Sequence, residues 1–158
     1  MKLEQKIYRV LTQKGYKVAT AESCTGGLVA ATIINVSGAS QIIDMSFVTY
    51  SNQAKEELVY VKNETLKEFG AVSEQVAMQM AQGAKQHANA NIGLATSGIA
   101  GPSGGTKTKP VGMVCFGICV NDKTYTYTHI FKNISRTYIR KQAVKFVLKK
   151  LLEILKNE

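Results

Sequence analysis

Apolar positions recur with two different periods along this chain, which predicts a mixture of helices and strands. Residues 2–14 are amphipathic at helical spacing, and the pattern stops at Gly15. A strong helix is also predicted over residues 72–89, with Ser73 as its N-cap. A long closing helix follows from apolar residues that repeat every fourth position, namely Ile139, Ala143, Val147, Leu151 and Leu155.

Short apolar runs between these helices read as strands, and further short helices connect them. The predicted strands cover residues 16–23, 45–50, 91–98, 111–120 and 124–131. Asn121-Asp122-Lys123 separates the last two strands and indicates a hairpin. The shorter helical segments are predicted at residues 27–38, 40–44, 52–59 and 63–70. Helices that alternate with strands before a hairpin predict one α/β domain over residues 1–158, with a mixed sheet between two helical layers.

Composition is typical of a globular protein, with 45% hydrophobic and 20% charged residues. No apolar run is long enough to cross a bilayer and the start does not resemble a signal peptide, so we expect a cytoplasmic protein without a membrane partner. The net charge is +9, and residues 132–158 hold eight basic and two acidic residues. A solvated helix face explains this charge better than a nucleic-acid surface, because no aromatic–basic interleaving or zinc-finger motif accompanies it.

The three cysteines do not form a disulfide framework or a metal site. Cys115 and Cys119 are four residues apart in an apolar strand, so they share one face and are expected to be buried thiols. The chain has only two histidines, His87 and His129. This small supply of ligands predicts neither a metal nor a cofactor.

Two glycine-containing loops are candidates for binding a ligand. In "AESCTGG", Ser23 and Thr25 offer hydroxyl groups, and Gly26 lets backbone amides turn toward an anion at the start of the next helix. A simple helix cap explains the same residues equally well. The second loop, "TSGIAGPSGGTKTKP", begins at Ser97 and Gly98 and is not a Walker A motif. A loop of this length in so small a domain favours a functional role.

A strand-to-helix corner, "MSFVTYSNQAK", places Tyr50 and Lys55 five residues apart. Lys55 is either a surface lysine or a general base, and a base needs a pKa lowered by burial or a neighbouring cation. Its partner would be a hydroxyl nucleophile, since no serine–histidine–aspartate arrangement is visible. Arg136 and Arg140 leave one face of the closing helix near its start, which suits either a phosphate clamp or a charged surface.

Several motifs together resemble the CinA C-terminal domain family over nearly the whole chain. They are "TAESCTGGLVA", "FVTYSNQAK", "GAVSEQVA", "SGIAGPSGGTKTKPVG" and "RTYIRKQAV", in this order. The resemblance implies a nicotinamide mononucleotide (NMN) amidohydrolase, which converts NMN to nicotinate mononucleotide and ammonia in pyridine nucleotide recycling. It leads us to expect no cofactor, a small nucleotide as substrate and a homo-oligomer.

The resemblance also implies roles for particular residues. Ser40 in "SGASQ" would be the nucleophile, Lys55 its base and Tyr50 an assisting hydroxyl. Substrate binding is expected from two loops and from the start of the closing helix: Ser23, Thr25, Gly26, Ser97, Gly98, Arg136 and Arg140. The tripeptide that ends at Arg136 is Ile-Ser-Arg in this chain, whereas family members often have Gly-Asp-Arg at this place.

Three other functions compete with this interpretation. A dehydrogenase would use a tyrosine–lysine pair, but the spacing here has four intervening residues and no glycine fingerprint accompanies it. A hydrolase based on Cys24 would need a thiol activated at a helix start. A non-enzymatic interaction module would bind protein or nucleic acid through the basic closing helix.

Overall fold

The computed structural model describes all 158 residues as six α-helices, one short 3-10 turn and five strands. In chain order they are α1 (Leu3–Lys14), β1 (Val18–Glu22), α2 (Leu28–Ile33), η1 (Ala39–Gln41), β2 (Phe47–Val48), α3 (Asn52–Val59), α4 (Asn63–Phe69), α5 (Glu74–Ala88), β3 (Ile92–Gly98), β4 (Met113–Val120), β5 (Lys123–Ile130) and α6 (Arg136–Lys156).

The five strands form one mixed sheet in the order β2-β1-β3-β4-β5. β1 runs parallel to both β2 and β3, whereas β4 runs antiparallel to both of its neighbours, β3 and β5. All five side chains of β1 are buried, because neighbouring strands flank it and helices cover both of its faces. The mixed sheet confirms the predicted fold class.

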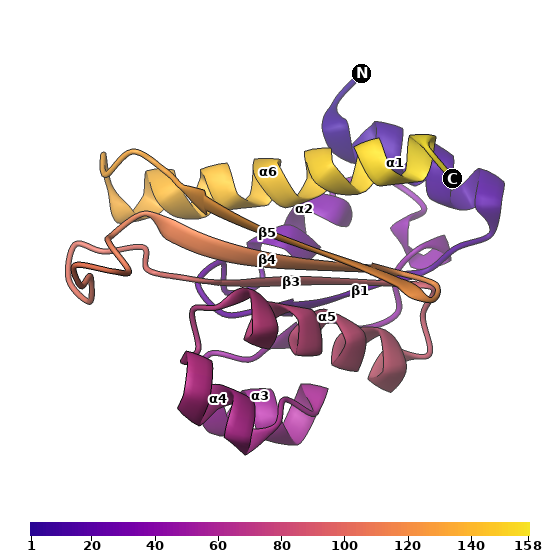
Figure 1. Ribbon diagram of the computed structural model, residues 1–158. Helices are drawn as coiled ribbons and strands as arrows, with labels where there is room; N and C mark the ends of the chain where they lie inside the picture. Colours follow the sequence, from indigo (N-terminus) through magenta and orange to yellow (C-terminus); the bar gives the residue numbers. More distant parts are fainter.

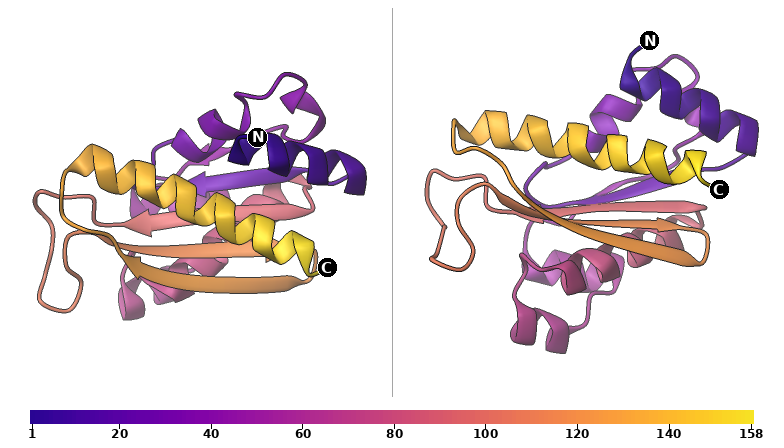
Figure 2. Two further views of the ribbon diagram at one scale, coloured as in Figure 1. Left: turned by 90° about the horizontal axis from the view of Figure 1, so that it is seen from above. Right: turned by 45° about the horizontal axis from the view of Figure 1, so that its top comes forward.

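Two helical layers cover the sheet (Figure 1). α1, α2 and α6 lie on one face, and α3, α4 and α5 lie on the other. The larger core cluster joins β-strand residues to α1, α2 and α6, while the smaller one lies beneath α5. α6 crosses the sheet obliquely, and its first turn lies at the same end of the sheet as the long loop between β3 and β4 (Figure 2). This arrangement brings the start of α6 to the end of the sheet where the parallel strands finish.

Close packing of α3 against α5 depends on Gly83. A Cβ atom built at Gly83 would lie only 1.7 Å from the carbonyl oxygen of Val59 at the end of α3. No side chain fits in this space, so the glycine lets the two helices approach backbone to backbone. α3 is therefore held at a fixed distance from α5, and its buried residue Lys55 is fixed with it.

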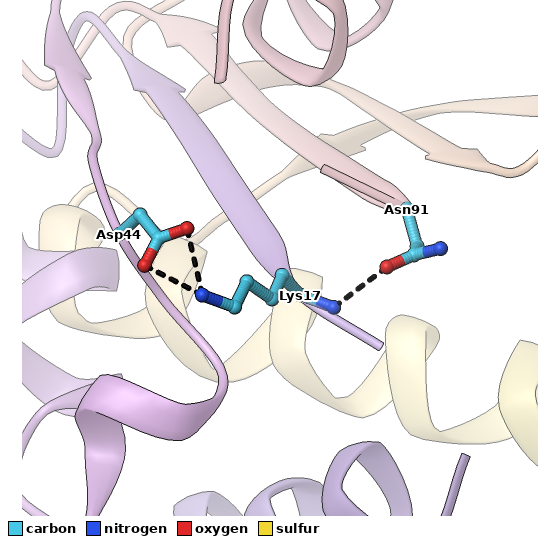
Figure 3. Close-up of polar contacts among 3 residues, drawn as sticks. All are labelled: Lys17, Asp44 and Asn91. Carbon is cyan, nitrogen blue, oxygen red and sulfur yellow. Dashed lines mark hydrogen bonds and ion pairs between the residues drawn. The ribbon is translucent and has the colours of Figure 1, made fainter. Parts of the chain in front are cut away.

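A polar clip fixes the opposite, amino-terminal end of β1 (Figure 3). The backbone N–H of Lys17 donates to Asn91 Oδ1 at 2.9 Å, and Lys17 Nζ forms an ion pair with Asp44 at 2.8 Å. One residue further along, Val18 forms a parallel bridge with Ile43. The segment that contains η1 is thus attached beside the start of β1, away from the end of the sheet where the parallel strands finish.

The predicted elements are found in the predicted order, although two are shorter than expected. β2 pairs with β1 at only two positions, because the chain turns at Ser51 to begin α3. α2 ends at Ile33, and η1 follows within the segment predicted as a helix over residues 40–44. None of the helices combines the length and the apolar character needed to span a bilayer.

Candidate active site

A cleft of about 350 Å³ lies outside the carboxyl ends of the parallel strands. β1 is the strand at which the chain reverses direction across the sheet, with β2 on one side and β3 on the other. Ligand sites in open α/β sheets form at such switch points, because the loops there diverge and leave a crevice. Residues from five separate segments line the cleft: Ser23 and Cys24; Tyr50, Asn52 and Lys55; Ala71 and Val72; Gly98 to Gly101 with Ser103 and Gly104; and Arg136, with Ser97 at the base.

Lys55 is buried at the bottom of this cleft with only 1% of its surface exposed. It occupies the first turn of α3, which Ser51 caps by accepting a hydrogen bond from the Ala54 N–H at 3.0 Å. Its Nζ donates to three oxygens: Ser23 Oγ at 3.1 Å, the Thr49 carbonyl at 2.8 Å and the Tyr50 carbonyl at 3.2 Å. The burial of a lysine whose partners are all uncharged is rare and indicates a functional position.

Burial lowers the pKa of Lys55 from 10.5 to about 8. The charged form loses hydration in the protein interior, and no carboxylate forms an ion pair with it, since the ion pairs of the chain are Lys17–Asp44 and Lys150–Glu153. At pH 7 a lysine with this pKa is neutral for roughly 10% of the time, against ~0.04% for an unperturbed lysine. A neutral amine has two N–H groups, enough for the two carbonyls, and one lone pair that could accept the proton of the Ser23 hydroxyl.

Ser23 lies at the end of β1 in a tight turn that a buried carboxylate holds in shape. Glu22 is 1% exposed. Its carboxylate accepts hydrogen bonds from the backbone N–H of Gly27 at 3.2 Å, Val29 at 2.8 Å and Ala30 at 3.0 Å. The hydroxyls of Thr20 and Thr25 donate to it as well, at 2.9 and 2.7 Å. Five donors meet the hydrogen-bonding needs of this buried carboxylate. Its negative charge lies at the start of α2, where it binds the free N–H groups of the helix.

Arg136 connects three parts of the cleft. From the first turn of α6 its guanidinium donates to the Gly101 carbonyl at 2.8 Å and to the Tyr50 hydroxyl at 3.1 Å. Tyr50 is 62% exposed, so its ring forms an outer wall of the cleft. The Tyr50 hydroxyl and Lys55 do not act as a bonded pair, because Lys55 reaches the carbonyl of Tyr50 instead. This geometry does not support the tyrosine–lysine arrangement of a dehydrogenase.

Ser97 and Gly98 line the cleft, as predicted, at the end of β3. Ser97 is 1% exposed, and its hydroxyl donates to the Ala71 carbonyl at 2.7 Å. This hydrogen bond ties the loop before α5 to the base of the cleft. Gly98 leaves room for Val114, whose side chain would lie 2.7 Å from a Cβ atom there. Both residues therefore shape the base of the cleft.

Ser40 is not brought to Lys55, and the expected nucleophile–base pair is wrong in this respect. It lies exposed on η1, beside the amino-terminal end of β1. β1 rises roughly 3.3 Å per residue, so its two ends are about 13 Å apart. The serine that the fold places against Lys55 is Ser23, which the sequence had assigned to substrate binding.

Three predicted substrate-binding residues do not line the cleft either. The Thr25 hydroxyl donates to Glu22 and therefore accepts from Thr96 Oγ1 at 2.7 Å. Arg140 donates to the Cys24 and Thr25 carbonyls, at 2.8 and 3.0 Å, and Gly26 lies against its guanidinium. These residues hold the turn instead of facing a ligand. The amides of α2 that were candidates for an anion site are already occupied by Glu22.

The thiol of Cys24 is not activated by its position before α2. Burial raises the pKa of Cys24 to about 11, so the thiol stays protonated at neutral pH. A nucleophilic thiolate is thus disfavoured here. Cys115 and Cys119 are also free and buried on β4, as their spacing predicted.

Glu22 is the functional residue that sequence reasoning missed. Its signal was present as a carboxylate that ends a short, mostly apolar strand directly before a Ser-Cys-Thr-Gly-Gly turn. A charged residue at the end of a buried strand needs several donors, and the following helix start supplies them. Asn52 and Ser103 were missed as well, because nothing in their local sequence distinguishes them from ordinary loop and cap residues.

The fold and the cleft define an α/β domain with a serine–lysine pair at the carboxyl ends of its parallel strands. The chain belongs to the CinA C-terminal domain family, whose model matches residues 1–155. It is 48% identical over 149 residues to a competence-damage inducible protein of Clostridioides difficile (strain 630), covering 94% of this chain and 35% of that protein. It is 47% identical over 146 residues to a CinA-like protein of Kosmotoga olearia, covering 92% of this chain and 35% of that protein. The chain spans about a third of the length of these curated relatives.

Solved structures share the fold over almost the entire chain. The competence/damage inducible protein CihA from Agrobacterium tumefaciens superimposes with a TM-score of 0.91 at 41% identity, covering 98% of this chain and 95% of that one. The competence damage-inducible protein A (ComA) from Klebsiella pneumoniae gives a TM-score of 0.94 at 35% identity, covering 98% of this chain and 95% of that one.

Proposed function

We propose that this chain hydrolyses the carboxamide of nicotinamide mononucleotide to nicotinate mononucleotide and ammonia. The observation that carries the proposal is the 3.1 Å hydrogen bond between Lys55 Nζ and Ser23 Oγ at the bottom of the cleft. An amide is a poor electrophile, and its hydrolysis needs an activated nucleophile and a base that works near neutral pH. A buried lysine with a lowered pKa meets the second need.

Ser23 is the nucleophile in this proposal and Lys55 is the general base. Neutral Lys55 accepts the hydroxyl proton while the Ser23 oxygen attacks the carboxamide carbon. The C–N bond then breaks, ammonia leaves with a proton returned to it, and an ester between Ser23 and the nicotinoyl carbon remains. Water hydrolyses this ester, again with Lys55 as the base, and nicotinate mononucleotide is released.

The backbone around Ser23 supplies a donor for the developing oxyanion. Cys24 directly follows the nucleophile and lines the cleft, and its backbone N–H donates to no other residue of the chain. An amide directly after a nucleophilic serine is the usual first donor of an oxyanion hole. Removing one such donor typically costs 10²- to 10³-fold in kcat.

The phosphate of the nucleotide is assigned to Arg136 and the loop after β3. Arg136 is exposed at the mouth of the cleft, and the nearby Ser103 and Gly104 border the same space. A guanidinium can bind a phosphate through two parallel hydrogen bonds. Tyr50, which Arg136 holds by its hydroxyl, is the proposed assisting group on the outer wall.

The decisive experiment measures nicotinate mononucleotide and ammonia released from NMN by the purified protein and by two serine variants. Ser23→Ala is expected to lower kcat by at least 10³-fold, because it removes the attacking oxygen. Ser40→Ala serves as the matched control and is expected to retain near-normal turnover. No turnover by the wild-type protein, or a greater loss in Ser40→Ala than in Ser23→Ala, would refute the assignment.

A further inference from the structure

Arg140 lies beside the turn Ser23–Gly27 but outside the cleft, and we propose that it is a positioning residue for Ser23. Its guanidinium donates through Nε to the Cys24 carbonyl at 2.8 Å and through Nη2 to the Thr25 carbonyl at 3.0 Å. The two carbonyls belong to the residues that directly follow Ser23. Holding them restrains the backbone of Cys24 and Thr25, and thereby the peptide unit between Ser23 and Cys24 that carries the Cys24 N–H. The proposal rests on the function proposed above.

The turn is held from two sides by groups of opposite charge. Glu22 accepts hydrogen bonds from the Gly27 N–H and the Thr25 hydroxyl of the turn, and from N–H groups in the first turn of α2. Arg140 binds carbonyl groups of the same turn from the start of α6, more than a hundred residues later in the chain. Hydrogen bonds to charged groups are stronger than neutral ones, so a turn held by both is more rigid than a capped loop. Both charged side chains are occupied by these hydrogen bonds, and neither lines the cleft.

Gly26 provides the space that this arrangement requires. Its φ is +56°, and a Cβ atom built there would lie 3.3 Å from Arg140 Nη2. A side chain would be strained by the backbone conformation and would press on the guanidinium. The glycine of "CTGG" thus permits the arginine to close over the turn.

The two arginines of α6 consequently have different tasks, although they are one helical turn apart. Arg136 points into the cleft and binds the Tyr50 hydroxyl and the Gly101 carbonyl. Arg140 points at the turn and does not border the cleft. Loss of Arg136 removes a group that substrate can touch, whereas loss of Arg140 loosens the nucleophile. Kinetic constants distinguish these two effects, because a substrate contact acts on KM and a positioning contact acts on kcat.

The first test needs no substrate. Hydrogen exchange measured by mass spectrometry on the full chain follows the amides of residues 23–30 in the wild type, Arg140→Ala and Arg136→Ala. Arg140→Ala is expected to speed exchange of these amides at least tenfold, whereas Arg136→Ala leaves them unchanged. Equal exchange in wild type and Arg140→Ala would overturn the proposal, and this result would hold whether or not NMN is the substrate.

The second test uses NMN turnover. Arg140→Ala is expected to lower kcat about 100-fold with KM within about threefold, since displacement of a reacting group by 1 Å costs this much. Added guanidinium chloride at millimolar concentration is expected to raise the kcat of Arg140→Ala at least tenfold. Lys141→Ala, the next residue on the helix and exposed, is the control with unchanged constants. A raised KM with normal kcat would instead make Arg140 a substrate ligand and overturn the proposal.

Arg140→Lys covers the case in which the alanine variant does not fold. A lysine reaches one carbonyl and keeps the positive charge, so faster exchange at residues 23–30 and an intermediate kcat are expected. Wild-type exchange and turnover in Arg140→Lys would contradict the requirement for a bidentate contact and overturn the proposal.

Discussion

Lys55 Nζ lies 3.1 Å from Ser23 Oγ, although the two residues are 32 positions apart in the chain. Ser23 follows the last residue of β1, and Lys55 lies in the first turn of α3, which follows β2. Parallel pairing of β1 with β2 brings the two junctions together at one end of the sheet. The close approach of α3 to α5 at Gly83 then presses the lysine into the protein interior.

Activity toward NMN is expected to rise with pH and to level off above about pH 8. The folded pKa of Lys55 is lowered to about 8, and only the neutral amine accepts a proton. Below this pKa, kcat/KM should fall about tenfold for each pH unit. A pH–rate profile from pH 6 to 9.5 measures the effect. A flat profile, or activity in Lys55→Arg, would exclude Lys55 as the base.

Tyr50→Phe and Arg136→Ala should affect different constants. Phenylalanine removes the hydroxyl that we propose as the assisting group, so kcat is expected to fall about 100-fold, within the range of general acid–base effects. Arg136→Ala removes the proposed phosphate contact, so KM is expected to rise at least tenfold. Steady-state kinetics with NMN give both values. Nicotinamide riboside has no phosphate, so its turnover should fall in Tyr50→Phe but not in Arg136→Ala. If Arg136→Ala lowered kcat/KM equally for NMN and for the riboside, the phosphate assignment would be contradicted.

Replacement of Cys24 by alanine should leave most of the activity. Burial raises the pKa of this thiol to about 11, so a thiolate is nearly absent at neutral pH. Cys24→Ala is expected to retain kcat within about fivefold. Iodoacetamide should label Cys24 only slowly below pH 9, as read by peptide mass spectrometry. Rapid labelling at pH 7, together with loss of activity in Cys24→Ala, would point to a cysteine nucleophile instead.

Gly83→Ala should destabilise the fold, although the same exchange usually stabilises a helix by up to about 1 kcal/mol. The added carbon would lie 1.7 Å from the Val59 carbonyl oxygen, so α3 must move away from α5. Overpacking of this kind costs about 1–3 kcal/mol or more. Urea unfolding measures the change, with Gln75→Ala on the exposed face of α5 as the control. A stabilised Gly83→Ala protein would show that the two helices do not approach as closely as described.

The order and type of the elements could be predicted because they depend on local properties of the chain. The apolar repeat from Ile139 to Leu155 and the cap at Ser73 act within one or two helical turns. Alternation of helices with strands also led to the mixed sheet. The likeness of several motifs to one family also drew attention to five residues that line the cleft: Ser23, Tyr50, Lys55, Ser97 and Arg136.

The partners within the site depended on contacts that no local pattern encodes. The sequence contains five serines before Lys55. Only strand pairing decided that Ser23 lies at the carboxyl end of β1 while Ser40 lies beside its opposite end. Likewise, Arg136 and Arg140 look equivalent along the helix, but the loops packed against α6 give them different acceptors.

The sequence by itself determined the helices, the strands, the buried stripe of each and the loops that carry polar groups, because these follow from side-chain chemistry over a few residues. The tertiary structure decided which serine meets the lysine, which charges are neutralised inside the protein and which remain in the cleft. These outcomes depend on the register of the sheet and on helix packing, where residues distant in the chain exclude water together and thereby set the pKa of Lys55.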